Sequence, residues 1–283
     1  MQKITAFIDG SSYAESVCDH AVWAASRLNM PVALVHVLGR RSDASSQPAD
    51  LSGNLSLGAR SDLMEKLARL DEERAALARE RGRALLDDAR ARIGDGIEVS
   101  TRLRSGDLSD AVHELEPETR FAIIGKRGEA ADFEKMHLGS NLDRLVRMAN
   151  RPVLVVSRSF RPIESFLLAF DAGPSAQRAV ERLAEGSVPR GTRCHILTVG
   201  DATPATRDRL SAAAAALRKA GYAVEEHLVQ GHPEEAIARA VRETGADLLV
   251  LGKSGHSRLR QLFIGSTTLD LMRTCPVPVL IFP

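Results

Sequence analysis

Apolar residues in the second half of the chain recur in short runs, separated by stretches with helical periodicity. Helical patterns cover Ala176–Leu183, Arg207–Ala220 and Pro233–Thr244, and Pro233 suits a first helical turn. Strands that alternate with helices favour a parallel sheet covered on both faces. The strands expected from the apolar runs are Phe166–Phe170, His195–Val199, Ala223–Val229, Leu248–Leu251 and Val277–Phe282.

The first half repeats this order of elements. Asp9 aligns with Asp171, and Val37 with Val199, at an offset of 162 residues. We therefore predict two tandem Rossmann-like α/β domains, residues 1–158 and 163–283, each a five-stranded parallel sheet flanked by helices. The first-half strands are expected at Ile4–Ile8, Val32–Val37, Ile97–Leu103, Phe121–Ile124 and Val153–Val156. Later landmarks align at offsets of 125 to 127: Gly106 with Gly231, Gly125 with Gly252, Gly139 with Gly265, and Pro152 with Pro278.

The fall in offset from 162 to 125 places 37 extra residues in the first half, within an insertion at about 39–92. Its Ser/Gly/Pro-rich start, Ser42–Gly58, predicts a mobile loop. Leucines at positions 63, 67, 70 and 77 then recur at helical spacing, which predicts a long amphipathic helix reaching about Arg92. Two interpretations stay open for this helix: a lengthened surface helix, or an arm that binds a partner.

Composition narrows the class of protein. The 283 residues suit about two domains, and 44% hydrophobic against 4% aromatic residues predicts a core of aliphatic side chains. The net charge of +1 gives no field to attract nucleic acid or an anionic membrane. No apolar run approaches the ~20 residues of a membrane span. Cys18, Cys194 and Cys275 are too scattered for a disulfide framework or a zinc motif, so we expect a cytoplasmic protein.

Glycine-rich segments follow the fourth strand of each half. In the second half, Gly252 and Gly255 precede nine further residues and then Gly265-Ser266-Thr267, which opens a helix. Glycines let backbone amides approach an anion, and a helix N-terminus adds unpaired N–H groups, so this pattern predicts a phosphate cradle. The first-half segment has one residue more between its second and third glycines: Gly125, Gly128, Gly139, Ser140 and Asn141.

The spacing Gly-x2-Gly-x9-Gly-Ser/Thr, followed by a helix and a Pro-Val-Leu strand, resembles the ATP-binding signature of the universal stress protein family. The resemblance covers two tandem copies and leaves out the insertion. It implies that Asp171 and the backbone of Val199 hold the adenine and ribose end of ATP. It assigns the phosphates to Gly252, Gly255, Gly265, Ser266 and Thr267. The first-half counterparts are Asp9, Val37, Gly125, Gly128, Gly139, Ser140 and Asn141.

Other roles are open for several of these residues. Asp9 and Asp171 suit the support of a helix start as well as a ligand. Ser140 and Ser266 are equally typical of helix N-caps. Charged residues in or near the glycine loops, which suit either phosphate contacts or solvated surface positions, are Lys126, Arg127, Lys253, His256 and Arg258. Histidines such as His36 and His113 lack metal-ligand spacing, so we predict no metal site, although Mg²⁺ is a usual companion of ATP.

Catalytic motifs are missing from the sequence: there is no P-loop, no nucleophile elbow and no His-Glu-x2-His motif. We therefore predict no catalytic residues. The resemblance implies a regulatory ATP-binding module of the stress response, in which bound ATP alters the surface offered to an unknown protein partner. Two rival functions remain: a nucleotide-free adaptor and a slow ATP hydrolase. The matching loop length favours the second half as the better nucleotide site.

Each half ends in an apolar strand, at Pro152–Val156 and Pro278–Phe282. An uncovered edge strand exposes unpaired backbone groups. The resemblance implies the usual solution, since single-domain members of that family dimerise through the last strand, so we expect these two strands to pair with each other about a pseudo-twofold axis. Association of two chains into a homodimer is a further expectation.

Overall fold

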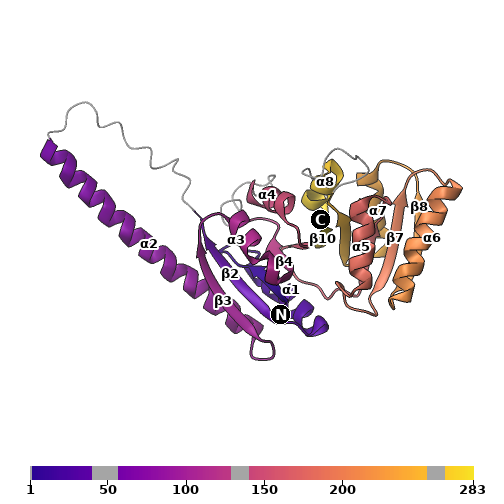
Figure 1. Ribbon diagram of the computed structural model, residues 1–283, viewed down its shortest axis with the longest axis horizontal. Helices are drawn as coiled ribbons and strands as arrows, with labels where there is room; N and C mark the ends of the chain where they lie inside the picture. The colour runs from indigo at the N-terminus through magenta and orange to yellow at the C-terminus, as the bar shows by residue number, and fades with distance from the viewer. Residues whose placement is uncertain (1, 40–56, 129–139, 254–264) are drawn as a thin grey trace.

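In the computed structural model, which describes residues 2–39, 57–128, 140–253 and 265–283, ten strands form one sheet (Figure 1). The strand order is β3-β2-β1-β4-β5-β10-β9-β6-β7-β8. The first-half strands are β1 (Lys3–Phe7), β2 (Val32–Leu38), β3 (Val99–Ser105), β4 (Thr119–Gly125) and β5 (Val153–Val156). The second-half strands are β6 (Ser165–Ala169), β7 (Arg193–Val199), β8 (Ala223–Val229), β9 (Leu248–Gly252) and β10 (Val279–Phe282). All ten expected strands are confirmed, with ends that shift by at most two residues.

Helices cover both faces of this sheet. One hydrophobic layer packs α1 (Ala14–Leu28), α2 (Leu57–Ile93), α5 (Pro174–Ala184) and α6 (Pro204–Lys219) against it. The opposite layer contains α3 (Leu108–Leu115), α4 (Ser140–Met148), α7 (Pro233–Thr244) and α8 (Ser266–Thr274). A short 3₁₀ turn, Glu116–Glu118, follows α3. Among the helices of the described ranges, none combines the length and apolar character needed to cross a bilayer.

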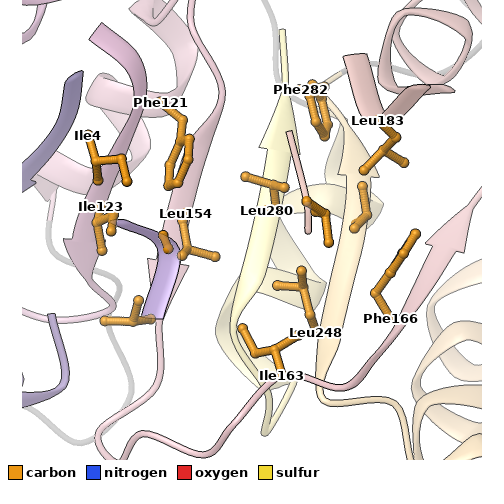
Figure 2. Packing of buried hydrophobic residues seen from close by; sticks show 14 of the residues in the cluster. Ile4, Phe121, Ile123, Leu154, Ile163, Phe166, Leu183, Leu248, Leu280 and Phe282 are labelled. Atoms are coloured by element: carbon orange, nitrogen blue, oxygen red, sulfur yellow. The ribbon is translucent and has the colours of Figure 1, made fainter. Parts of the chain in front are cut away.

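Pairing of the two terminal strands confirms the expected contact between the halves. Strands β5 and β10 are antiparallel, with Leu280 opposite Leu154, and all other strand pairs in the sheet are parallel. Figure 2 shows these two leucines on the two sides of this β5–β10 seam. The two five-stranded sheets therefore join into one, because each half covers the edge that the other would expose.

Equivalent turns reinforce the internal repeat. Gly106, between β3 and α3, has a φ of 129°, and Gly231, between β8 and α7, has a φ of 125°. Residues with a side chain larger than hydrogen rarely adopt such φ values, so both turns require glycine.

The three cysteines are all buried, and none of them forms a disulfide.

Helix α2 confirms the long helix of the insertion, and several of its predicted apolar positions are exposed. Figure 1 shows it extending well beyond the sheet. Its C-terminal part packs on the core through Leu86, Ala89 and Ile93. The apolar side chains further toward its start are between 46% and 64% exposed: Met64, Leu67, Leu70 and Leu77. The loop expected at Ser42–Gly58 lies outside the described residues up to position 56.

Candidate functional site

The two segments that the sequence singled out in the second half meet at one edge of the sheet. Asp171 follows β6, and Gly252 ends the neighbouring strand β9. The helices after these strands lie on opposite faces, α5 in one hydrophobic layer and α8 in the other. Such a divergence creates the crevice where open α/β sheets bind ligands. The candidate site therefore lies at the carboxyl ends of β6 and β9.

Asp171 shapes the turn between β6 and α5. Its Oδ1 accepts a hydrogen bond from the backbone N–H of Gly173 at 2.8 Å, and Gly173 is the N-cap of α5. Asp9 makes the equivalent bond to the N–H of Ser11 at 3.1 Å. Ala172 has a φ of 57°, which is unfavourable for a residue with a Cβ. Both aspartates therefore support the turn before a helix, and ligand binding would be an additional role for them.

A second pair of equivalent residues fixes the backbone just before each aspartate. The hydroxyl of Thr198 donates to the carbonyl of Phe170 at 2.8 Å, and His36 Nδ1 lies 2.7 Å from the carbonyl of Ile8. These partners occupy matching positions at the offset of 162 residues. Val199 and Val37 come directly after Thr198 and His36, at the carboxyl ends of β7 and β2. Sequence reasoning missed Thr198, although the repeat alignment places it opposite His36.

The first glycine of each loop is required by packing. A Cβ on Gly252 would lie 2.8 Å from Cβ of Ser175 and 3.0 Å from the backbone nitrogen of Ala176, in the first turn of α5. A Cβ on Gly125 would lie 2.7 Å from Cβ of Tyr13 in the first half. Both distances are shorter than normal contacts, so these glycines let the ends of β9 and β4 approach the starts of α5 and α1, the helices that follow the neighbouring strands β6 and β1. A Cβ on Gly128 would meet Oδ2 of Asp9 at 3.1 Å, which places that glycine beside the aspartate.

The N-terminus of α8 presents the amides expected for an anion site. Gly265 is the N-cap, and its own N–H donates to the carbonyl of Lys253 at 3.1 Å. Ser266 is the first helical residue and is exposed, so the N-cap role considered for it is wrong. The hydroxyl of Thr267 donates to Oε1 of Glu234 at 2.6 Å, and this bond lowers the pKa of Glu234. The N–H groups of a helix's first turn lack partners within the helix, so they are the donors an anion would meet.

Several residues of the predicted site lie outside the described part of the chain. These are Gly139 and Gly255, together with His256 and Arg258. Ser140 and Asn141 open α4, but their side chains are not described.

Two lysines of the glycine loops have a role that the sequence did not reveal. Lys253 Nζ donates to the carbonyl of Ala149 at 3.3 Å, and Lys126 Nζ donates to that of Cys275 at 2.9 Å. Each lysine thus crosses the seam to the C-terminal end of a helix in the other half. Burial lowers the pKa of both amines. Lys253 is buried, so it is not a solvated surface charge, and each ammonium donates to a carbonyl of the other half.

The strand order, the paired halves and the glycine-lined edge define a tandem α/β protein of the Rossmann-like type. The family model described as "Universal stress protein family" matches residues 1–157 and again 162–283. The chain therefore belongs to the universal stress protein family, with two such domains in tandem.

Several known proteins are similar to this chain. Universal stress protein Slr1230 of Synechocystis is 35% identical over 286 residues, which covers 100% of both chains. The crystal structure of a universal stress protein from Archaeoglobus fulgidus has a TM-score of 0.65 at 20% identity, covering 99% of this chain and 95% of that one. A universal stress protein crystallised in complex with cAMP covers 42% of this chain and 95% of its own, at 28% identity and a TM-score of 0.36.

Proposed function

We propose that the second half of this chain binds ATP at the carboxyl ends of β6 and β9, and that bound ATP alters the surface offered to a protein partner. The observation that carries this proposal is the meeting of the Asp171 turn, Gly252 and the α8 N-terminus at one edge of the sheet. We take the two domains as residues 1–158 and 163–283. Three free, buried cysteines suit a reducing compartment, so we propose a cytoplasmic protein.

Each residue has a defined task in this proposal. Asp171 presents Oδ2 to the ribose, because its Oδ1 is bonded to the turn, and the backbone of Val199 contacts the adenine. Gly252 and Gly255 let the loop backbone approach the phosphates. Since the Gly265 amide is bonded to Lys253, the phosphates meet the following amides, those of Ser266 and Thr267. The first half offers a weaker version of this site through Asp9, Val37, Gly125, Gly128, Gly139, Ser140 and Asn141.

Glu234 adds a negative charge next to the proposed phosphate site. Its carboxylate holds Thr267, the second residue of α8. A carboxylate beside phosphates is repulsive unless a cation lies between them. Carboxylate and phosphate oxygens are ligands that Mg²⁺ prefers, so Glu234 would help hold Mg²⁺ bound with ATP.

Hydrolysis of bound ATP should be negligible. A general base works best when its pKa lies near the operating pH. The hydrogen bond from Thr267 moves the pKa of Glu234 below its usual value, away from that range. We expect phosphate release by purified protein with Mg²⁺ and ATP far below the ~1 s⁻¹ of dedicated enzymes. Turnover at that rate, abolished by Gly265→Asp, would establish the hydrolase instead.

Whether the purified protein contains adenine nucleotide distinguishes ATP binding from the nucleotide-free adaptor. Protein purified without added nucleotide is denatured, and the supernatant is chromatographed for ATP, ADP and AMP. Tight binding leaves adenine nucleotide in the supernatant. A clean supernatant, together with no saturable uptake of added ATP, supports the nucleotide-free adaptor.

Helix α2 suggests where a second copy of the chain could bind. We propose that its exposed apolar residues form an antiparallel contact between two chains. Residues 63–73 contain four acidic and two basic side chains, whereas residues 74–83 contain four basic and one acidic. Antiparallel helices would place each acidic stretch beside the basic stretch of the other copy, and oppositely charged surfaces favour association.

Sedimentation equilibrium tests this contact. We expect wild-type protein to form dimers, and the double variant Leu70→Glu/Leu77→Glu to be monomeric because charges replace apolar contacts. Ala68→Glu is the matched control, since helical periodicity turns residue 68 away from the leucines. The proposal is wrong if the double variant dimerises like wild type, or if wild type is monomeric.

A further inference from the structure

Three side chains with metal-binding atoms converge on the last two strands of the sheet. His195 comes from β7, and Glu225 and His227 come from β8. In the parallel register, His195 lies opposite Glu225, and His227 lies two residues further along β8. Side chains two residues apart share one face of a strand, so all three point to the same side of the sheet. Their ligand atoms lie within 4.8 Å of one another.

The separations match the requirements of a tetrahedral metal ion. His195 Nδ1 lies 3.2 Å from His227 Nε2 and 3.4 Å from Glu225 Oε2. Ligands bound to Zn²⁺ at about 2.0–2.1 Å in tetrahedral geometry are roughly 3.3–3.4 Å apart. Both separations from His195 therefore already suit an ion, and the ligand atoms of Glu225 and His227 lie within 4.8 Å of each other. Without an ion, the two imidazoles share a hydrogen bond, with one nitrogen donating and the other accepting.

We propose that His195, Glu225 and His227 form a Zn²⁺ site with three protein ligands and a fourth position open to water. Two imidazoles and one carboxylate are a ligand set typical of zinc sites that keep an open position. His195 is buried and held by the sheet, whereas Glu225 is exposed on the outermost strand. An ion can therefore enter from solvent while His195 supplies a fixed ligand.

The fold itself does not require this cluster. The same positions in the first half are Ala33, opposite Ser100, with Arg102 two residues further along β3. None of these side chains is a zinc ligand of the usual kinds. The second half therefore carries the cluster as an addition to the shared framework.

The proposed metal site is separate from the nucleotide site. His195 and Val199 are four residues apart on β7, which corresponds to about 13 Å along a strand. A bound ion would link the outermost strand β8 to its neighbour β7. Because this region lies away from the crevice, zinc binding does not depend on the proposal for ATP.

Metal titration of untagged, chelator-treated protein tests the assignment. We expect one Zn²⁺ per chain, and Co²⁺ in its place should give the intense visible absorption of a four-coordinate ion. His227→Gln and Glu225→Gln should each weaken binding by at least about tenfold, because even residues that merely support metal ligands have effects of that size. His113→Gln is the control, since His113 is exposed on α3.

Thermal unfolding checks that the metal-free variants stay folded. If each variant unfolds near the wild-type temperature, its loss of binding reflects the loss of a metal ligand. Wild-type protein that takes up no Zn²⁺, or uptake unchanged by both His227→Gln and Glu225→Gln, overturns the proposal.

Discussion

Replacing Gly265 with aspartate should remove most ATP binding while the protein stays folded. Gly265 is the N-cap of α8 with a φ of −63° and a ψ of 147°, a conformation open to any residue. Aspartate is a favoured N-cap, so its carboxylate would bond to the amides of the first turn. It would then occupy the position of the phosphates and repel them. Repulsion between like charges costs several kcal/mol, so we expect affinity to fall by at least about 100-fold.

Two controls make this result specific. Gly265→Asn caps the helix without a charge and should retain more binding than Gly265→Asp. Gly139→Asp places the same change in the first half, where the loop has one more residue, and should cost less total binding. Calorimetric titration of ATP into the three variants gives the comparison. A larger loss from Gly139→Asp than from Gly265→Asp would assign the main site to the first half.

The two lysines that cross the seam should hold the halves together. Lys126→Met and Lys253→Met each leave a helix-end carbonyl without its charged donor. Leaving a buried acceptor unsatisfied costs about 1–3 kcal/mol, so the double variant should lose about 2–6 kcal/mol of unfolding free energy. Urea unfolding measures this change. Lys219→Met, at the exposed end of α6, is the control and should stay within about 0.5 kcal/mol of wild type.

The stability that these two lysines contribute should increase with pH. Burial lowers the pKa of both lysines in the folded protein, so the unfolded chain binds more protons between the folded value and the unfolded value of about 10.4. Wild-type stability therefore gains from these lysines as the pH rises through that window. The difference between wild type and the double variant should widen there. A double variant as stable as wild type at every pH would show that the lysines do not hold the seam.

Local patterns predicted the strands because each is an apolar run bounded by turn residues. The repeat then predicted the pairing of β5 with β10, since two apolar terminal strands needed cover. Helical spacing predicted α2 but not its burial: Leu77 and Leu86 are both leucines of one helix, and only the sheet beneath Leu86 distinguishes them. The partners of Lys126 and Lys253 could not be predicted, because they lie across a seam whose geometry depends on both halves.

In the candidate site, too, local features were predictable from the sequence, whereas contacts between distant segments were not. The glycine spacing predicted the α8 N-terminus, because loop and helix are adjacent in sequence. The close approach of Gly252 to Ser175 depends on strand order, so it became visible in the structure alone. His195 and His227 come from separate strands, and nothing in their sequence spacing indicates that they meet. Short-range patterns thus identified the elements, and the contacts between them required the fold.

Calorimetric titration of ATP into nucleotide-stripped wild-type protein is the direct test of whether this chain binds ATP. We expect saturable binding with one stronger site per chain, in the second half, and little heat from GTP at the same concentrations. Titration with Mg²⁺ present should show the stronger binding, because the cation offsets the charge of Glu234. The absence of saturable binding up to about 1 mM ATP, where a site would contribute only about 4 kcal/mol, would show that the chain is not an ATP-binding protein.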